Sequence, residues 1–226
     1  MDWNEKLIEF SKEGNLEGVK EALSNGADIH AASEEGEYEG RTDDALVEAA
    51  ENGHLEVVNY LIDQGANIHA EDDSALIYSA YHGHLPVVQY LVERGANIHA
   101  LDDRALYWSA YHGHLPVVQY LVEQGANIHA RDDGALQASA CNGHLEVVQY
   151  LVELGCDPQI VIDYEDSDKS VKEWAEKYIN ARDLSNKLDN NLADKPLTKA
   201  QKLSNDIESE DFVYQPTTTK SARTKL

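Results

Sequence analysis

The sequence predicts an all-α solenoid of about five helix pairs, closed by a C-terminal capping helix and followed by a disordered tail. Two observations predict this class. A block that reads Gly-His-Leu, one variable residue and Val-Val recurs every 30 residues, beginning at Gly53, Gly83, Gly113 and Gly143. A second glycine follows the first of each block 12 residues later. Self-similarity at a fixed period of this length indicates one supersecondary unit stacked on copies of itself.

The first helix of a unit is predicted by apolar and small residues at helical spacing. Within residues 74–100, Leu76, Ser79 and Ala80 fall on one face at i, i+3 and i+4. The two small side chains allow neighbouring helices to approach closely. Asp73 precedes this helix and is expected to cap it by accepting hydrogen bonds from the free N–H groups of the first turn.

The second helix of the unit is predicted between two glycines. Gly83 ends the first helix, and the apolar residues from Leu85 to Val92 then continue at helical spacing. Pro86 lies in the first turn, where a missing N–H group costs nothing. Gly95 follows as a C-terminal cap in the left-handed conformation. Residues 97–100 are expected to run extended to the next unit.

These blocks resemble the ankyrin repeat family. The resemblance rests on the glycine pair, the Gly-His-Leu-Glu-Val-Val block and the Gly-Ala-Asn-Ile-His-Ala stretch, and it covers residues 1 to about 182. The usual unit of about 33 residues carries a Thr-Pro-Leu-His stretch. Here the segment Asp72-Asp73-Ser74-Ala75-Leu76 makes the unit three residues shorter. The resemblance therefore implies a shortened finger, in which other groups replace the hydrogen bonds of the missing Thr and His. Units of 30 residues with Asn-Ile-His-Ala also resemble the ankyrin proteins of giant DNA viruses of amoebae, such as mimivirus.

The array is expected to have distinct ends. Residues 1–31 predict a degenerate N-terminal capping repeat, residues 32–40 an acidic insertion loop, and residues 41–158 four repeats. Residues 167–182 predict the capping helix, because one of its faces gathers apolar side chains, namely Val171, Trp174, Ala175, Tyr178 and Ile179. Residues 185–226 lack apolar periodicity and predict a disordered tail.

Composition narrows the class of partner. The net charge is −24, and residues 42–158 carry 18 acidic against 3 basic side chains. Such a surface repels phosphate backbones, which argues against nucleic acid, and it attracts a protein with a basic patch or simply keeps the chain in solution. No apolar run is long enough to span a membrane. The two cysteines show no Cys-x-x-Cys spacing and suit a reducing compartment, so we expect the protein in the cytoplasm. We also expect a monomer.

Motifs for catalysis are missing from the sequence. It contains no phosphate-binding glycine loop, no Gly-x-Ser-x-Gly and no His-Glu-x-x-His, so neither an enzyme nor a cofactor is expected. Eight of the ten histidines recur at two repeat positions, which favours structural hydrogen bonds. No cysteine lies at zinc-finger spacing, so no metal is expected. The repeated Asp-Asp pairs are interpreted as caps of helices and turns.

The candidate partner-binding site lies on the first helices of the two middle repeats. The face opposite their buried residues carries Ile77, Tyr78, Tyr81, His82, Tyr107, Trp108, Tyr111 and His112. The family resemblance implies that partners bind this concave side, and tyrosine and tryptophan contribute most of the energy at interface centres. The alternative is that Tyr78 and Trp108 fill space left by the shortened fingers.

The sequence thus predicts a non-enzymatic scaffold or adaptor, and the resemblance implies a viral or effector protein acting on host proteins. Two alternatives stay open. No lysine occurs between Lys20 and Lys169, which fits an adaptor in ubiquitin signalling that avoids ubiquitin attachment, or a strong acidic bias. The C-terminal Thr224-Lys225-Leu226 fits a ligand for a PDZ groove.

Overall fold

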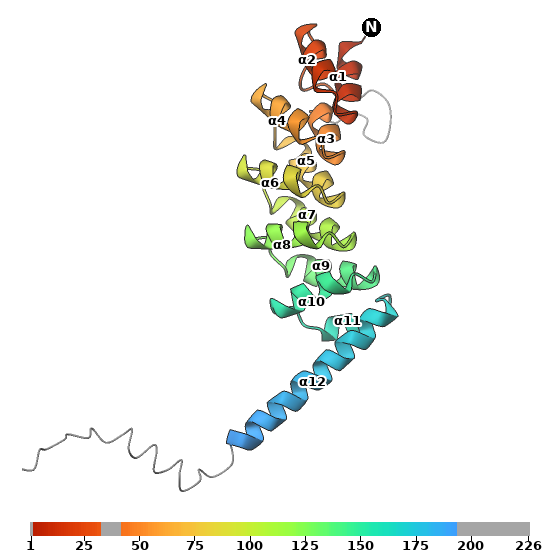
Figure 1. The fold of residues 1–226 in the computed structure, drawn as a ribbon, viewed down its shortest axis with the longest axis vertical. Helices are drawn as coiled ribbons and strands as arrows, with labels where there is room; N and C mark the ends of the chain where they lie inside the picture. The colour runs from red at the N-terminus through yellow and green to blue at the C-terminus, as the bar shows by residue number, and fades with distance from the viewer. Residues whose placement is uncertain (1, 33–41, 194–226) are drawn as a thin grey trace, which may run out of the picture. The chain divides into compact units, whose positions relative to one another are not determined.

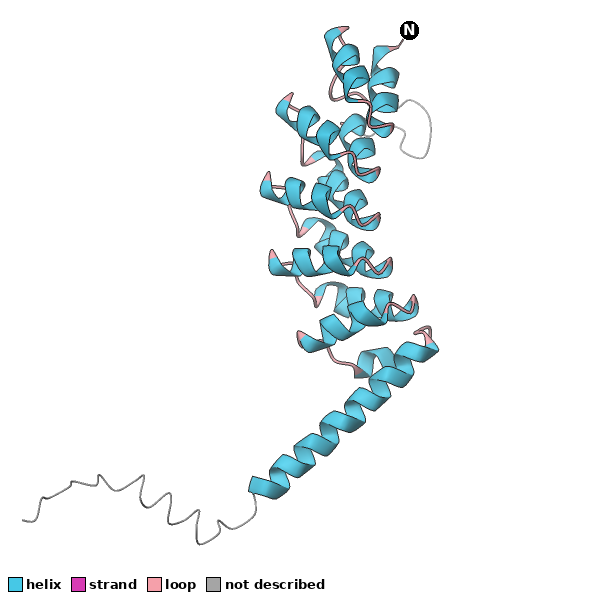
Figure 2. Ribbon diagram, viewed as in Figure 1, coloured by secondary structure: helices cyan, strands magenta, loops and turns pink. Residues whose placement is uncertain are grey.

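The structure is a computed structural model that describes residues 2–32 and 42–193, and these ranges hold helices and no strand (Figure 2). In chain order the helices are α1 (Trp3–Lys12), α2 (Leu16–Ser24), α3 (Asp44–Glu51), α4 (Leu55–Asp63), α5 (Ala70–Tyr81), α6 (Leu85–Glu93), α7 (Ala100–Tyr111), α8 (Leu115–Glu123), α9 (Ala130–Cys141), α10 (Leu145–Glu153), α11 (Gln159–Asp163) and α12 (Lys169–Ala193). The chain divides into two compact units, residues 1–179 and 180–226. The expected tail motif at 224–226 and all but the first residue of the expected insertion at 32–40 lie outside the described residues.

Successive helix pairs stack within the first unit, as the colours of Figure 1 show. The first helices α1, α3, α5, α7 and α9 each contact the next, and the second helices α2, α4, α6, α8 and α10 do the same. Helices α3 to α10 also contact each other within their pairs. This arrangement confirms the predicted all-α solenoid.

One leucine per helix forms the centre of a continuous core. The leucines that are at most 1% exposed occupy equivalent positions of their repeats: Leu7, Leu46, Leu76, Leu106 and Leu136 on the first helices, and Leu61, Leu91, Leu121 and Leu151 on the second. Burying a leucine side chain contributes roughly 2 kcal/mol. The sequence repeats this contribution at every unit, so a thin layer of side chains stabilises the whole stack.

The last three repeats begin with a left-handed turn. Three consecutive residues, Glu71, Asp72 and Asp73, have φ angles of 50°, 55° and 62°, and the same conformation recurs at residues 101–103 and 131–133. A left-handed residue other than glycine costs roughly 1–2 kcal/mol, somewhat less for aspartate. The turn stands where the sequence predicts a shortened finger.

The expected extended course of residues 97–100 is wrong. Ala100 N–H donates to Asn97 O over 3.1 Å, and His99 N–H donates to the Asn97 side chain over 3.0 Å. These bonds close a tight turn. The asparagine side chain favours a turn here, because it accepts a hydrogen bond from the backbone two residues later.

The C-terminal part of the first unit contains a helix that the repeat pattern does not predict. The short helix α11 places Val161 in the core with no exposed surface. Helix α12 begins at Lys169, and its Val171 and Ala175 are also fully buried, as the predicted capping face requires. Helix α12 continues to Ala193. The expected start of a disordered tail at Ser185 is therefore wrong, and residues 194–226 lie outside the described part of the chain.

Candidate functional site

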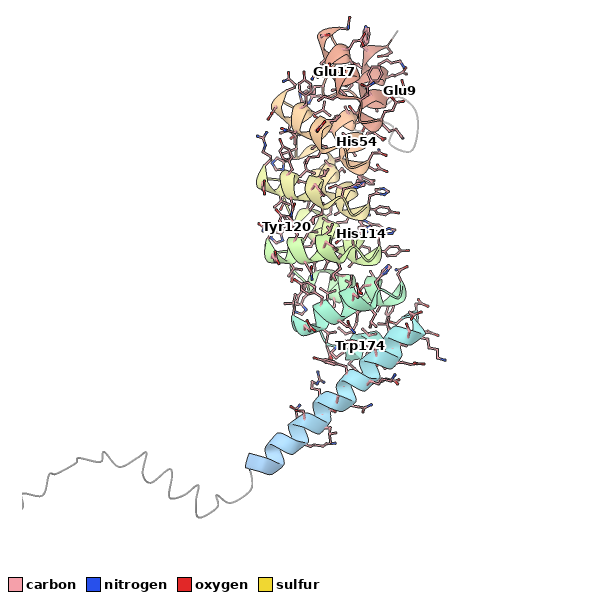
Figure 3. All side chains as sticks on the ribbon, in the orientation of Figure 1. Glu9, Glu17, His54, His114, Tyr120 and Trp174 are labelled. Atoms are coloured by element: carbon pink, nitrogen blue, oxygen red, sulfur yellow. The ribbon has the colours of Figure 1, made fainter. Side chains whose placement is uncertain are left out.

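The first set of recurring histidines joins each repeat to the one before it. The Nε2–H groups of His84, His114 and His144 donate to the backbone oxygens of Glu51, Tyr81 and Tyr111 over 2.9, 3.0 and 2.9 Å. Figure 3 labels His54 and His114, which belong to this set. Burial lowers the pKa of His84 and of His114, with the neighbouring histidines adding to the effect. Both rings are therefore neutral at pH 7. The bonds from these rings to the preceding repeats confirm the predicted structural hydrogen bonds.

The second set of histidines pairs with aspartates of the left-handed turns. Asp103 Oδ1 accepts from His99 Nδ1 over 3.0 Å and from the backbone N–H of Asn127, in the next repeat, over 3.0 Å. Asp73 makes the same two bonds to His69 and Asn97. These bonds correct the expected capping role, because Asp73 and Asp103 bond to the next repeat instead, as does Asp43, the first member of its pair. Asp43 likewise makes no cap hydrogen bond to α3.

The predicted site residues of the two middle repeats form one aromatic cluster. The cluster consists of the rings of Tyr81, His82, Tyr107, Trp108, Tyr111 and His112 on α5 and α7 and at their C-terminal ends. Tyr81 lies at the centre, with its ring centroid 5.3 Å from that of Trp108 and 4.1 Å from that of His112. Trp108 also contacts Tyr107 and Tyr111 edge to face, with centroids 5.1 and 5.3 Å apart. Offset and edge-to-face contacts of this kind are the favoured arrangements of aromatic rings.

A first hollow of about 450 Å³ opens beside this cluster. Its lining residues come from α3, α5 and α7: Glu51, Ser74, Ile77, Tyr78, Tyr81, His82, Leu101, Arg104 and Trp108. Glu51 Oε1 lies 3.4 Å from His82 Nε2, while its Oε2 is buried without a hydrogen-bond partner among the described residues. The hollow therefore combines aromatic and apolar side chains with a carboxylate at its α3 side and the guanidinium of Arg104.

A second hollow of about 490 Å³ lies towards α9. Its lining residues are Arg104, Tyr107, Trp108, Tyr111, Arg131, Gly134, Gln137, Ala138, Cys141 and Tyr164. The guanidinium carbon of Arg104 lies 5.8 Å from the Trp108 ring centroid, and that of Arg131 lies 5.5 Å from the Tyr107 centroid. Both distances allow a cation–π attraction. Trp108 and Arg104 line both hollows, so the two are neighbours.

The predicted site residues differ in how far their side chains are exposed to solvent. His82 is exposed, and Tyr78, Tyr81, Tyr107, Trp108, Tyr111 and His112 are half-buried. Ile77 is only 6% exposed, so it belongs to the core and reaches the first hollow with its edge alone. Burial lowers the pKa of His112, so its ring is neutral at pH 7.

The sequence interpretation missed the arginines of the site. Arg131 lies in the left-handed turn, and Arg104 directly follows the equivalent turn of the preceding repeat. Both lie outside the four positions per helix considered for the site. Their presence in a repeat region that carries only three basic residues is a signal that the sequence already contains.

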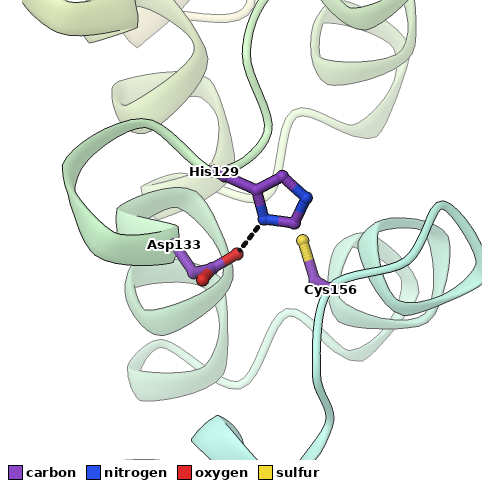
Figure 4. Close-up of side chains that lie close together, drawn as sticks. All are labelled: His129, Asp133 and Cys156. Atoms are coloured by element: carbon purple, nitrogen blue, oxygen red, sulfur yellow. Dashed lines mark hydrogen bonds and ion pairs between the residues drawn. The ribbon is translucent and has the colours of Figure 1, made fainter.

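One further group of side chains comes together at the last repeat. His129, Asp133 and Cys156 each offer a ligand atom, and these atoms lie within 4.8 Å of one another (Figure 4). Burial raises the pKa of the Cys156 thiol to about 12, with the hydrogen bond to Asp133 and the charge of Asp133 adding to it. At pH 7 the thiol is thus protonated and donates to the carboxylate.

Comparisons with known proteins agree with the geometry of the stack. No curated protein matches the chain. Among the residues that the structure describes, no helix combines the length and apolar character needed to cross a membrane. Residues 7–102 and 101–162 match the family profile described as ankyrin repeats (3 copies), which is a protein–protein interaction domain. Since these matches span more than half of its length, the chain belongs to the ankyrin repeat family.

Proposed function

We propose that the chain is a non-enzymatic adaptor that binds a partner protein with the aromatic cluster. The observation that carries the proposal is that five of the six rings of the cluster line one or both of two adjacent hollows. Tyrosine and tryptophan are the residues most enriched among binding hot spots, because they offer a large rigid surface and a polar group. The other first helices present Glu48 and Gln137 at equivalent positions, which lack this surface.

The charges around the cluster define the chemistry of the partner. Glu51 borders the first hollow with its carboxylate, which suits a lysine or arginine of the bound protein. Arg104 and Arg131 border the second hollow and suit an acidic side chain. The proposed ligand is a segment with apolar residues in the middle, a basic residue towards α3 and an acidic residue towards α9. Basic groups elsewhere on the partner would speed association with the acidic repeats.

Paired substitutions test this surface. Tyr81→Ala with Tyr111→Ala should weaken binding of a partner purified with the wild-type chain, because removing an anchor tyrosine costs roughly 2 kcal/mol, about thirtyfold in affinity. Isothermal titration calorimetry measures the affinity. Glu48→Ala with Asn142→Ala is the control on the flanking repeats, because neither side chain lines a hollow. Circular dichroism checks that both variants stay folded.

Two outcomes separate the proposal from its alternative. Loss of binding in the tyrosine pair alone supports the aromatic cluster as the interface. Binding that survives in the tyrosine pair but is lost in the flanking pair would contradict it. The aromatic rings would then serve only to fill the space beside the left-handed turns.

A role directed at host proteins is a second proposal. It is supported by the likeness of the 30-residue units to ankyrin proteins of giant viruses and by the missing lysines between Lys20 and Lys169. A protein that works beside ubiquitin ligases gains lifetime if its repeats offer no site for ubiquitin attachment. The lysine substitutions given in the Discussion test this proposal independently of the aromatic cluster.

A further inference from the structure

The histidine–aspartate pair at the start of α9 differs from its equivalents in the residue that faces it. Histidine–aspartate pairs occur at His69–Asp73 and His99–Asp103 as well as at His129–Asp133. The pair alone is therefore part of the repeat architecture. The residue that faces the pair from the end of the following helix is alanine in the earlier repeats and Cys156 in the last. Cys156 N–H donates to Leu151 O as Ala126 N–H donates to Leu121 O, so the backbone is equivalent and the thiol is new.

The acidic member of the last pair is also more accessible. The side chain of Asp133 is 20% exposed, against 7% for Asp73 and for Asp103. The side chain of His129 is 56% exposed, whereas Cys156 is buried below it. An ion could therefore reach the three groups from solvent past the imidazole, and a water molecule could bind on the same side.

We propose that His129, Asp133 and Cys156 bind a zinc ion, with water as the fourth ligand. Zinc prefers imidazole nitrogen, carboxylate oxygen and thiolate sulfur in tetrahedral geometry. A nitrogen and an oxygen bound to one tetrahedral zinc ion lie roughly 3.3 Å apart, given metal–ligand distances near 2.0–2.1 Å. His129 Nδ1 and Asp133 Oδ1 are 2.7 Å apart, so binding needs a small outward rotation of two accessible side chains.

Binding exchanges a proton for the metal ion without any redox step. The Cys156 thiol loses its proton to water as the sulfur–zinc bond forms. The proton on His129 Nδ1 moves through water to Nε2, so that the neutral ring binds zinc with the Nδ1 lone pair and the His129–Asp133 hydrogen bond is replaced by two bonds to the ion. The ion would connect the turn before α9 with the end of α10. Such a connection would fix the last repeat directly before α11.

Cobalt substitution tests the proposal on the full chain. The chain, stripped of metal with a chelator and kept reduced with a phosphine, is titrated with Co²⁺, and the thiolate-to-cobalt charge-transfer absorption is recorded. Competition with a chromogenic chelator gives the zinc affinity. We expect one equivalent with the charge-transfer band, a melting temperature that rises with zinc, and a loss of affinity above about 100-fold in Cys156→Ala or His129→Gln.

Two matched controls complete the design. Cys156→Ala restores the alanine of the earlier repeats and is expected to fold. Cys141→Ser removes the other thiol, and His99→Gln alters the pair that faces Ala126, so both should leave the band and the affinity unchanged. Absence of the band in the wild-type chain, or its persistence in Cys156→Ala, would overturn the proposal. Absence of the band would mean that no thiolate binds the metal, and its persistence in Cys156→Ala would mean that Cys141 supplies the thiolate.

Discussion

At the scale of single residues, the two aspartates of each pair have different tasks. Asp103 is buried at the turn and joins His99 to the backbone of the next repeat, whereas its neighbour Asp102 is exposed. Both residues adopt the left-handed conformation, with φ angles of 55° and 57°. The sequence repeats the pair as a unit, but the hydrogen bonds separate a structural member from a solvated one.

We expect Asp103→Ala to destabilise the protein by about 2–4 kcal/mol, because it leaves the Asn127 N–H group and the His99 ring without their acceptor. Asp102→Ala is the control, since it changes the same left-handed backbone without breaking those bonds, and it should cost less than about 1 kcal/mol. Urea unfolding followed by circular dichroism measures both. Equal losses would show that the turn depends on backbone conformation and not on the aspartate bridge.

At the scale of elements, the cap depends on α11 and on the start of α12. Asp168 directly precedes α12. Its backbone N–H donates to Ala140 O of α9 over 2.9 Å, and its side chain accepts from Ser170 N–H in the first turn of α12. It lies next to Gly143, where the earlier repeats place a histidine against the corresponding glycine. The cap thus contacts the last repeat at the place where one repeat contacts the next, with an aspartate in the position of the histidine. Trp174 and Tyr178 stack on the same helix with centroids 5.2 Å apart, and Trp174 is labelled in Figure 3.

Truncation after Pro158 should lower the melting temperature and promote association, because it removes Val161, Val171 and Ala175 from the core and exposes the side of the last repeat. Truncation after Arg182 is the control. It keeps these residues, and the side chains at 183–187 are exposed. Differential scanning calorimetry and size-exclusion chromatography report the two effects. An unaltered melting curve and a monomeric profile after truncation at Pro158 would refute the capping role.

The period of the sequence accounts for α3 to α10, because the same glycines and leucines recur in every unit. It misses α11, since the motif ends after Gly155 and five residues are too few to show helical periodicity. It also ends α12 too early, because a polar helix carries no apolar signal beyond Ile179. In the candidate site, the aromatic rings follow from helical spacing. The arginines and the Cys156 group do not, because they depend on which turn of one repeat lies beside the next.

At the scale of the whole molecule, the repeats combine negative charge with a lack of lysine. Between Lys20 and Lys169 the basic residues are arginines alone, and these also lack the amine that accepts ubiquitin. Gln89 and Gln119 lie half-buried on α6 and α8, where a long side chain can extend its charged end into solvent. They are therefore suitable positions for restoring lysine.

Gln89→Lys with Gln119→Lys should shorten the half-life of the protein in cells that contain the ubiquitin system, while the melting temperature stays unchanged. A chase after inhibition of protein synthesis measures the half-life. Gln89→Arg with Gln119→Arg is the matched control, because it adds the same charge without an amine for ubiquitin. If all three proteins decay at one rate, acidic bias is the better explanation of the missing lysines.

Gain or loss of whole 30-residue units would leave the recurring hydrogen bonds between repeats intact. His84, His114 and His144 each reach a carbonyl 33 residues earlier. Asp43, Asp73 and Asp103 each bond an N–H group 24 residues later. A duplicated unit would therefore meet, on both sides, partners identical to those it already binds. Insertions of other lengths would move donors away from acceptors at one join. Unequal recombination within the gene could thus lengthen or shorten the array in a single event, without compensating mutations at the new boundaries.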